Sequence, residues 1–533
     1  MAIFGSGALA ADGARPMESL LIVEERIQHS GVGGLRATSI ITRAEIERRN
    51  PSSMPELLRD IPGVHLDRLG NAGGAANVYI RGGEPNHTLV LIDGVRMNDP
   101  TDLRGGSFDL SSISVDEVER IEIVRGSSSA QFGADAMGGT VNIVTRRAAA
   151  GRTSVEGRIA GGGQDYESGG ISAYGGFTRL LVAAGASFQE DGRVEDGGTV
   201  SLRTADASLR WNMPGSLEAS LIARHGERDS TAFPESSGGV QLAINRELEH
   251  RIARDTLLSA SVVWKPQDQI HLSLKAASTE RREARDSPAV AEGPGGFVPA
   301  TTAATRFERT GASLQVALQG SPANGTMIAG IESWREDGRR DSILHLDFDL
   351  PGSFALVRDT RSAFAQVEGE LVPKVRAQAA IRLDQVDPGD RKTSLSGGIG
   401  YRVAEWSSLR MHLSEGFKPP SFFALGDPLV GNPDLRPESS QNVEIGWDAF
   451  RDGASIQVTA FRNRYRDLVD FDPASFRMVN RSGARSSGVE LGASRPLTPN
   501  LRLNGAYTYA DARLEGTESR LRNRPLHRAS LDV

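Results

Sequence analysis

The chain has 533 residues, and its 61 Lys plus Arg and 68 Asp plus Glu give a net charge of −7, which argues against a general nucleic-acid binder. It contains no cysteine, so disulfide frameworks and cysteine-ligated metal sites are excluded. Glycine reaches 60 residues. No run approaches the ~18 apolar residues of a membrane helix, but a β-barrel stays open, because its strands are apolar only at every second position.

The N-terminal run MAIFGSGALA ends in Ala8-Leu9-Ala10, the small-x-small pattern of a signal-peptidase site. No charged start or long apolar run precedes it. Residues 1–15 are therefore expected to be either the remnant of a signal peptide or a disordered tail. Residues 16–30 contain the short β-prone run Glu18–Val23, which alone indicates no more than an edge strand.

Residues 31–150 predict a small α+β domain. Two capping boxes, Thr42-Arg43-Ala44-Glu45 and Ser53-Met54-Pro55-Glu56, mark the starts of short helices, and Pro62-Gly63 is expected to end the second. The glycine-rich segment Arg125–Gly133 is no phosphate loop, because no Gly-Lys-Ser/Thr follows it. Short apolar runs predict strands at Val78–Gly83, Thr88–Gly94, Val118–Val124 and Gly139–Thr145.

This domain resembles the plug domain of TonB-dependent outer-membrane receptors. The matching blocks are IRGG at Ile80–Gly83, HTLVLIDGVRMN at His87–Asn98, VERIEIVRG at Val118–Gly126 and FGADAMGGTVNIVT at Phe132–Thr145. The LIDGVR-N piece and Gly105–Ser112 are most similar to the cobalamin receptor branch of this family. The resemblance implies that the β-prone run is the TonB box, and that TonB binds Glu18, Ser19, Leu20, Leu21, Ile22 and Val23.

From residue 151 to 533 the pattern changes to a period of two. Leu272 and Leu274 alternate with Ser273 and Lys275, and about seventeen such segments follow one another. This is the period of strands with one face toward lipid and the other toward a polar lumen. Long polar stretches, such as 227–249 and 281–305, are expected to be loops on one side of a barrel. Late-barrel motifs of the same family resemble EGFKPPSF at Glu415–Phe422, GNPDLRPESS at Gly431–Ser440 and VNRSGARSSGVEL at Val479–Leu491.

The expected fold is therefore a large antiparallel transmembrane β-barrel filled by an N-terminal α+β plug. The resemblance implies a barrel of about 22 strands, whereas about seventeen precede Arg524-Pro525, and the chain ends at Val533. The barrel domain, residues 151–533, is expected to be incomplete at its C-terminus. A gap is expected between its first strand, near Val155–Gly161, and its last.

Five charged residues lie in or beside apolar strands of the plug. Buried charges need partners, so ion pairs with the barrel wall are predicted to seat the plug through Arg81, Asp93, Arg120, Glu122 and Arg125. The turn-rich loops 70–77 and 96–104 are either ordinary surface loops or, from the resemblance, the plug apex that faces incoming substrate. In the second interpretation the substrate contacts are Asn71, Arg96, Asn98 and Asp99.

Carboxylates in two predicted extracellular loops, Glu195, Asp196 and Asp229, are weak calcium candidates. Calcium prefers several converging oxygens, and Arg193 and Arg228 interrupt these. The nine histidines show no HExxH spacing, and no Gly-x-Ser-x-Gly is present. No catalytic constellation is found, so the protein is expected not to be an enzyme, and no cofactor is expected apart from calcium.

Together these features predict a transporter of the Gram-negative outer membrane, energised through TonB and its inner-membrane complex. Substrate would bind to barrel loops and the plug apex, and the TonB box would add as a strand to TonB. The expected substrate is a corrinoid, with a ferric siderophore as the alternative; lipid surrounds the barrel, and no nucleic acid is expected. The alternative of another class is a passive porin-like channel, against which the plug-like segment Val78–Thr145 argues.

Overall fold

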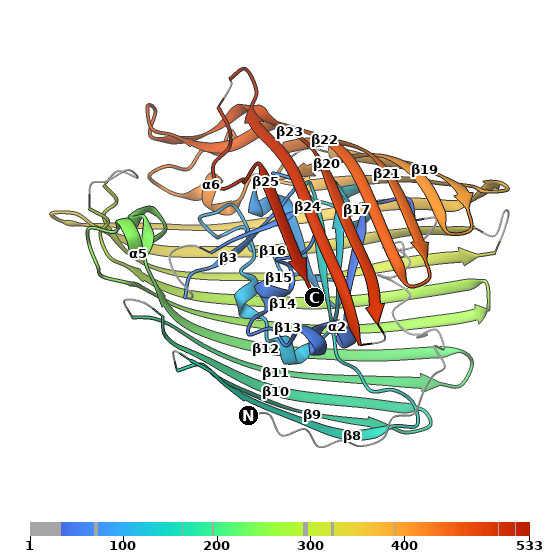
Figure 1. Ribbon diagram of the computed structural model, residues 1–533. Helices are drawn as coiled ribbons and strands as arrows, with labels where there is room; N and C mark the ends of the chain where they lie inside the picture. The colour runs from blue at the N-terminus through green and yellow to red at the C-terminus, as the bar shows by residue number, and fades with distance from the viewer. Residues whose placement is uncertain are drawn as a thin grey trace.

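The computed structural model describes residues 34–68, 73–163, 165–194, 197–291, 297–320, 325–389, 391–498, 500–517 and 519–533. It shows a small domain enclosed by a large curved β-sheet (Figure 1). The expected TonB box, Glu18–Val23, lies outside the described residues.

The enclosed domain, called the plug from here on, is built on a five-stranded mixed sheet in the order β1-β6-β7-β4-β5. β4 runs parallel to β7, and the other neighbours are antiparallel. A separate hairpin joins β2 to β3. The strands predicted at 118–124 and 139–145 are confirmed to within one residue. The bounds are β1 Thr38–Thr42, β2 Val64–Arg68, β3 Ala76–Ile80, β4 Thr88–Ile92, β5 Val95–Arg96, β6 Val118–Arg125 and β7 Gly139–Thr145.

Short helical segments connect these strands: α2 Arg43–Arg49, α3 Met54–Leu57, η1 Pro85–His87, η2 Leu110–Ser112, η3 Val115–Glu117 and α4 Ser129–Phe132. At α2 the predicted cap is present, because Thr42 Oγ1 accepts a hydrogen bond from the Glu45 N–H at 3.4 Å. At α3 the box is shifted: Ser53 makes no side-chain cap bond, and Glu56 Oε2 accepts from the Ser52 N–H at 2.8 Å. No helix in the described part of the chain is both long and apolar enough to cross a membrane.

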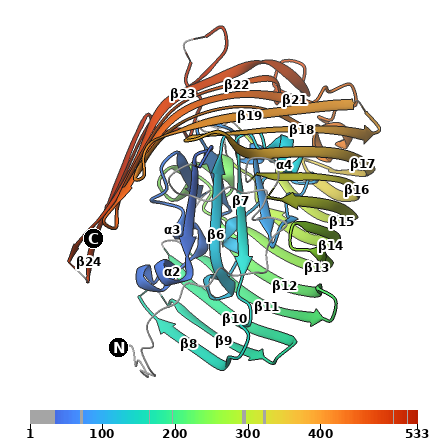
Figure 2. The same cartoon turned by 90° about the vertical axis from the view of Figure 1, so that its right-hand side faces the viewer.

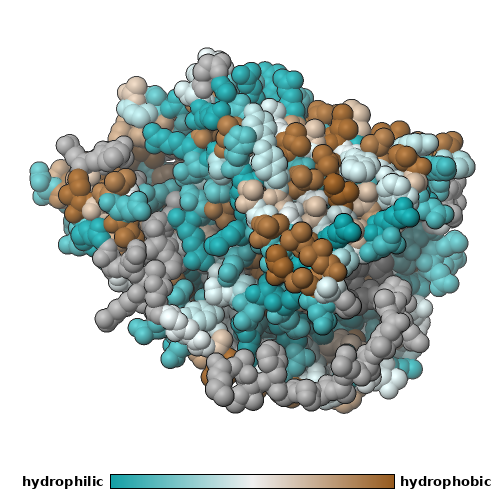
Figure 3. Space-filling model, in the orientation of Figure 1, coloured by the Kyte–Doolittle hydropathy of each residue, from teal (hydrophilic) through white to brown (hydrophobic). Residues whose placement is uncertain are grey.

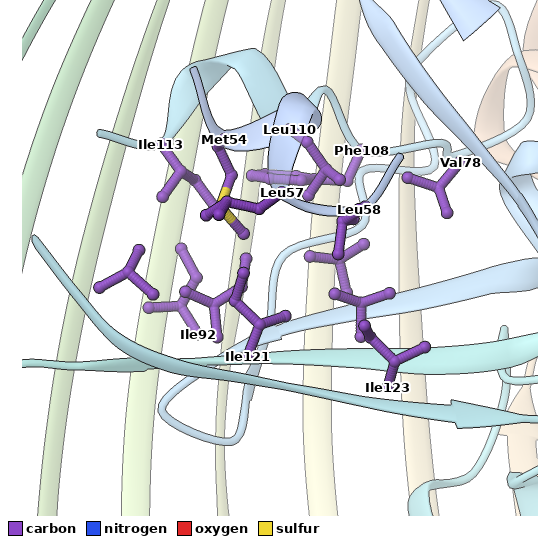
Figure 4. Close-up of a cluster of buried hydrophobic side chains, with 14 of the residues drawn as sticks. Met54, Leu57, Leu58, Val78, Ile92, Phe108, Leu110, Ile113, Ile121 and Ile123 are labelled. Carbon is purple, nitrogen blue, oxygen red and sulfur yellow. The ribbon is translucent and has the colours of Figure 1, made fainter. Parts of the chain in front are cut away.

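The core of the plug lies between its sheet and these helical segments (Figure 4). Met54, Leu57 and Leu58 pack in one buried cluster with Ile121 and Ile123 of β6. Full burial of a side chain of this size contributes about 1.5–3 kcal/mol relative to exposure. Apolar burial therefore holds the sheet and the short helices together as one unit.

The surrounding sheet contains eighteen strands of the described chain, β8 to β25. Each pairs antiparallel with the next in chain order. Their bounds are β8 Thr153–Gly161, β9 Glu167–Gly176, β10 Leu180–Val194, β11 Gly198–Met213, β12 Leu217–Ala232, β13 Glu249–Gln267, β14 Ile270–Ser287, β15 Ala300–Gln319, β16 Thr326–His345, β17 Asp349–Val372, β18 Val375–Asp387, β19 Arg391–Ala404, β20 Ser407–Lys418, β21 Glu438–Arg451, β22 Ala454–Asp472, β23 Arg477–Thr498, β24 Leu501–Leu514 and β25 His527–Asp532.

The connections between barrel strands differ in length at the two ends. At one end they are short turns, such as 268–269 and 452–453, and at the other they include the long segments 233–248 and 419–437. The long segments carry η4 Glu235–Ser237, α5 Gly239–Leu242 and α6 Phe422–Gly426; α5 lies at the left of Figure 1. In outer-membrane barrels the longer loops face the outside, so this end is called the external end.

The alternation along the barrel strands separates an apolar outer face from a polar lumen. Leu274 of β14 is 53% exposed while the adjacent Ser273 is 5% exposed, and Ile445 of β21 is 56% exposed while Glu444 is 4% exposed. The predicted period of two is therefore confirmed, with apolar side chains outward. Hydrophobic residues gather at the upper right of Figure 3, where Figure 1 places β19 to β24.

At the seam between the first and last barrel strands, the strand order and the residue pairing differ. The order closes into a ring in which β25 stands next to β8. Residue-by-residue register runs from β8 to β25, but among the described residues no register joins β25 back to β8, and Figure 2 shows these two edges apart. The expected gap thus agrees with the pairing and not with the strand order, and it stays a prediction.

Candidate functional site: the plug apex and the external vestibule

The external face of the plug, called the plug apex, consists of residues 73–75, 82–87 and 97–107. Arg228 of β12 donates to the Gly73 carbonyl at 2.6 Å, and Lys418 of β20 donates to the Gly105 carbonyl at 2.7 Å. Both donors lie near the external ends of their strands. The plug apex therefore lies beneath the long external connections, where an incoming ligand arrives first.

Asn98, a predicted substrate contact, is buried and holds the apex loop itself. Its Oδ1 accepts from the Val90 N–H at 2.8 Å. Its Nδ2 donates to the carbonyls of Thr88 at 3.0 Å and Gly106 at 2.8 Å. The amide is thus used by plug main chain, and in the structure Asn98 holds the apex loop.

Asp99, a second predicted contact, is also turned inward. Its Oδ1 accepts from the N–H and the hydroxyl of Thr101, at 2.8 and 2.6 Å, and its Oδ2 lies 3.9 Å from Arg281 of β14. Burial nevertheless raises the pKa of Asp99 to about 6, because desolvation of the carboxylate outweighs these partners. Asp99 therefore faces the barrel wall in the structure.

Arg96, at the end of β5, is held inside the plug as well. Its guanidinium donates to the Phe132 carbonyl and lies 3.9 Å from the carboxylate of Asp135. The fourth predicted contact, Asn71, lies outside the described residues. A direct role of any of the four in substrate binding stays a prediction.

Above the plug apex, arginines line a space called the external vestibule. A small cavity of about 10 Å³ is enclosed here by plug and barrel, with Gly73 and Phe233 among its lining residues. Guanidinium groups suit planar anionic partners such as carboxylate and phosphate. Sequence reasoning missed Arg251 and Arg285, because β13 and β14 reach beyond the predicted strand ends. Three ion pairs surround the cavity: Arg104–Glu235 at 3.2 Å, Arg251–Glu283 at 2.7 Å and Arg285–Glu249 at 2.5 Å.

Two of the predicted seating charges, Arg81 and Arg125, contact acidic residues of the barrel wall. Arg81 Nη1 lies 2.6 Å from Glu444 Oε2 of β21, and its Nε lies 2.7 Å from Glu490 Oε1 of β23. Arg125 Nε lies 3.5 Å from Glu490. Burial alone would lower the pKa of Arg81, but Glu490 and Glu444 hold it above its ordinary value. The guanidinium thus stays charged between the two carboxylates.

The other three predicted seating charges have different partners. Arg120 and Glu122, which share β6, pair with each other at 2.7 Å. The Asp93 carboxylate accepts from Arg147 at 2.8 Å, within the plug, and its main-chain carbonyl accepts from Lys275 of β14 at 2.9 Å. The ion pairs described for these three side chains therefore lie within the plug and not at the barrel wall.

Two carboxylates that sequence reasoning missed join the plug to barrel arginines. Glu117 accepts from Arg224 of β12 at 2.7 and 2.9 Å. Asp109 Oδ2 lies 3.4 Å from Arg228 and 3.5 Å from Arg251. In the sequence both carboxylates have the pattern of helix caps, which they also are. That pattern does not reveal a partner such as Arg224, 107 residues away from Glu117.

The described calcium candidate, Asp229, lies in β12 and not in a loop, because the strand runs on to Ala232. Its carboxylate bonds to His250 at 2.7 Å. The other candidates, Glu195 and Asp196, lie outside the described residues. Within the described ranges, no group of three or more His, Asp or Glu side chains is placed to hold a metal ion, and calcium binding stays a prediction.

A second cavity, of about 710 Å³, lies at the external ends of β13 to β17. Its lining includes Ile252, Ala284, Ala304 and Ile343. Along their strands these residues alternate with lumenal ones such as Arg251 and Arg285, so they belong to the outer face. Most of the lining therefore belongs to the outer face, while Arg285 and Ser342 also border the cavity.

A plug held inside a polar-lined antiparallel barrel, with its long connections at one end, defines a plugged outer-membrane receptor. Family models match both parts of the chain. The TonB-dependent Receptor Plug Domain matches residues 34–140, and the model named TonB dependent receptor-like, beta-barrel matches residues 188–533. The chain belongs to the TonB-dependent receptor family, as the resemblance implied. Members of this family are outer-membrane receptors of Gram-negative bacteria.

Individual proteins resemble the chain over most of its length. Curated relatives named vitamin B12 transporter BtuB include one from Vibrio vulnificus (strain YJ016), 25% identical over 491 residues, which are 91% of this chain and 77% of the relative. One from Vibrio cholerae serotype O1 (strain M66-2) is 25% identical over 501 residues, 91% of this chain and 76% of the relative.

Solved structures of the same fold are named for other substrates. The ferric yersiniabactin uptake receptor FyuA from Yersinia pestis has a TM-score of 0.77 at 16% identity, covering 93% of this chain and 82% of that one. A mutant of the ferric enterobactin receptor PfeA from Pseudomonas aeruginosa has a TM-score of 0.72 at 21% identity, covering 89% and 80%. At these identities the likeness shows the fold.

Proposed function

We propose that this receptor imports a corrinoid across the outer membrane, with energy supplied through TonB and its inner-membrane complex. One observation carries the transport part: the plug occupies the lumen and is held by buried ion pairs such as Arg81–Glu444 and Glu117–Arg224. Passage of a large solute therefore needs the plug to move. A passive porin-like channel would keep its lumen open.

The start of the described chain indicates where a pull on the preceding segment would act. The Arg36 guanidinium donates to Ser128 Oγ at 3.1 Å, and the Ala37 N–H donates to Glu444 Oε1 at 2.8 Å. The next residues form β1, an edge strand bonded within the sheet only to β6. Since Glu444 also binds Arg81, tension on this segment would act on a carboxylate that seats the plug.

We assign TonB binding to Glu18–Val23, which would add as a strand to TonB through main-chain hydrogen bonds. Leu20→Pro and Ile22→Pro remove a main-chain donor and disfavour strand pairing. Both should abolish uptake and leave substrate binding at the cell surface intact. Leu20→Ala, which keeps the N–H, is the matched control and should transport. Uptake that survives both proline substitutions would exclude this segment as the TonB contact.

Corrinoid is proposed as the substrate because the relatives named vitamin B12 transporter match 91% of the chain. A strain whose single receptor of this family is the present one should grow on limiting cobalamin. A ferric siderophore is the second candidate, favoured by the arginines of the external vestibule, since many ferric chelates carry negative charge. Growth on iron chelates without corrinoid binding would make the ferric siderophore the first candidate substrate and exclude the corrinoid.

A further inference from the structure

A buried arginine of the barrel, Arg340 of β16, forms no ion pair in the described part of the chain, and the carboxylates of Asp427, Asp102 and Glu283 act on it only from beyond ion-pair distance. It is 6% exposed, and its Nε–H is buried without an acceptor. Among the described residues no carboxylate lies within ion-pair distance of it; the contact shown for its guanidinium is the ring of Phe423, 5.8 Å away. A buried charge without a partner costs several kcal/mol. This arginine is therefore set apart from Arg81 and Arg224, whose guanidinium groups are held by glutamates.

The strand register places Arg340 beside a second arginine on the lumenal face. Arg285 of β14 lies opposite Ala303 of β15, and Ala303 lies opposite Ser342 of β16. Ser342 is two residues from Arg340 on the same face. The two arginines are thus neighbours across three strands at the external end.

The donors at this place outnumber the acceptors. Arg285 is held by Glu249 at 2.5 Å, and Arg251 of β13 is held by Glu283 at 2.7 Å. The Nε–H groups of Arg251 and Arg285 are buried without an acceptor, like that of Arg340. Buried N–H donors are ordinarily satisfied by protein or water. Arg251 and Arg285 line the small cavity of the external vestibule, and together with Arg340 they leave three buried N–H donors on β13, β14 and β16 without an acceptor, a pattern that an added oxygen acceptor would satisfy.

The surroundings of Arg340 add an aromatic surface. Phe354 of β17 lies opposite it in the register, and Phe423 of α6 covers its guanidinium. A flat guanidinium backed by aromatic rings favours a planar anion set in an otherwise apolar molecule. On the other neighbouring strand, β15, the residue opposite Arg340 is Thr305, which is uncharged.

We propose that Arg340 and Arg285 form an anion-recognition pair that binds a carboxylate, phosphate or phenolate group of the transported molecule. This inference rests on the proposed function, since it assigns the ligand to the substrate. Arg285 is already paired with Glu249, so the charge of Arg340 is the one that an added anion would offset, while Arg285 would supply a further donor. The phosphodiester of a nucleotide-bearing corrinoid and the oxygens of an anionic ferric chelate present the same chemistry.

Titration of the purified full-length receptor tests the pair. Arg340→Gln should weaken binding of the anionic substrate about 10- to 100-fold, the range of a charge-assisted hydrogen bond. The affinity of Arg340→Lys should lie between those of the native protein and Arg340→Gln, because lysine keeps the charge but cannot form the two parallel hydrogen bonds of a guanidinium. The control is Arg339→Gln, next in the chain but outward, 66% exposed and paired with Asp341, and it should bind as the native protein does.

The ligands separate the two sources of the anion. Cobalamin and cobinamide share the corrin ring, but cobinamide lacks the phosphate-linked nucleotide; a loss in Arg340→Gln for cobalamin alone identifies the phosphate. A loss for a ferric tris-catecholate, with no corrinoid binding, identifies chelate oxygens and overturns the corrinoid proposal while supporting the anion pair. Equal affinity of Arg340→Gln and native protein for whichever substrate binds would overturn the anion pair alone.

A measurement independent of transport completes the test. Pyrophosphate should raise the thermal midpoint of the native receptor relative to chloride at equal ionic strength, and it should not do so in Arg340→Gln. If the native receptor shows no such shift and no ligand distinguishes the variants, the unsatisfied donors are served by water and the anion pair is wrong.

Discussion

The plug meets the barrel at two walls of opposite charge. Toward β21 and β23, the plug supplies the cation: Arg81 lies between Glu444 and Glu490. Toward β12, the plug supplies the anion: Glu117 forms an ion pair with Arg224. A plug turned about the barrel axis would bring like charges together in a space with little water, which costs several kcal/mol. The two walls therefore fix the orientation of the plug in addition to retaining it.

The two walls also differ in what lies next to them. The acidic wall receives the start of the described chain, because Glu444 accepts from the Ala37 N–H. The basic wall continues upward into the external vestibule, where Arg251 binds both Asp109 of the plug and Glu283 of the barrel. Under the proposed function, the pull from TonB reaches one wall first and the substrate reaches the other.

The largest effect is expected at the acidic wall. Arg81→Met leaves Glu444 and Glu490 buried without their main cation, and loss of one member of a buried pair costs about 3–5 kcal/mol. The free energy of plug release should fall by this amount. It is measured in solubilised receptor as the urea dependence of hydrogen exchange in β6 and β7, with the exposed Arg59→Gln as control.

A triple variant sharpens this prediction. Removing all three charges together, in Arg81→Met with Glu444→Gln and Glu490→Gln, should recover most of the lost stability, because no uncompensated charge is then buried. A triple variant as unstable as Arg81→Met would mean that packing of the arginine stem, and not its charge, seats the plug.

A smaller loss is expected at the basic wall. Glu117→Gln removes the carboxylate, but Arg224 keeps the Ser112 carbonyl, to which it donates at 2.9 Å. The cost should therefore lie near the lower end of the buried-pair range, about 3 kcal/mol. A double-mutant cycle with Arg224→Met isolates the pair. If Glu117→Gln costs more than Arg81→Met, the ranking of the two walls is reversed.

The contrast between these walls marks what a sequence can supply. The strands β6 and β7 were predicted to within one residue, because their apolar runs are bounded by turn residues and depend on local pattern alone. The plug charges were recognised as needing partners, yet Glu117 was missed and Glu122 was given the wrong kind of partner. Which wall a charge faces depends on barrel residues hundreds of positions away, as with Arg81 and Glu490.

The external end shows the same limit. Polar residues such as Arg228 and Asp229 resembled a loop, because the predicted barrel strands were taken to end with the apolar alternation. In the structure β12 continues to Ala232, since a strand above the lipid can be polar on both faces without losing its ladder. Likewise Asn98 stands in a turn-rich stretch, and its burial becomes visible only when Val90 and Gly106 lie beside it.

Asn98 gives a prediction within the apex that is independent of either wall. Asn98→Ala removes three hydrogen bonds to plug main chain, and the loss should be about 1–2 kcal/mol, since part of that main chain can then reach water. Exchange of the Val90 amide should rise first. Asn98→Asp should be worse, because it sets a carboxylate oxygen against the carbonyls of Thr88 and Gly106. If Asn98→Ala binds substrate more weakly while hydrogen exchange of the Val90 amide is unchanged, Asn98 contacts the substrate, as predicted from the sequence.

The smallest effect is expected in the pH dependence of plug release, where the two sides of the plug oppose each other. Asp99, near Arg281 of the basic wall, has its pKa raised to about 6 by burial. His65 of β2 has its pKa lowered to about 4, first by burial and then by Arg528 and Arg524 near the C-terminus.

The signs of the two contributions differ. Between the ordinary carboxyl pKa and 6, the seated plug holds more protons at Asp99 than the released plug does, so this contribution to stability falls as pH rises through that window. Between pH 4 and the ordinary histidine value, the seated plug holds fewer protons at His65, so that contribution is present above the window and falls as pH drops through it. In the native receptor the two slopes partly cancel between about pH 4 and 6.

Asp99→Asn should leave a stability that declines on acidification, and His65→Gln should leave one that rises. For both variants the urea midpoint of plug release is measured as a function of pH, and the released fraction is read by hydrogen-exchange pulses at one common pH. If the midpoint depends on pH in the same way in both variants, neither group titrates differently when the plug is seated.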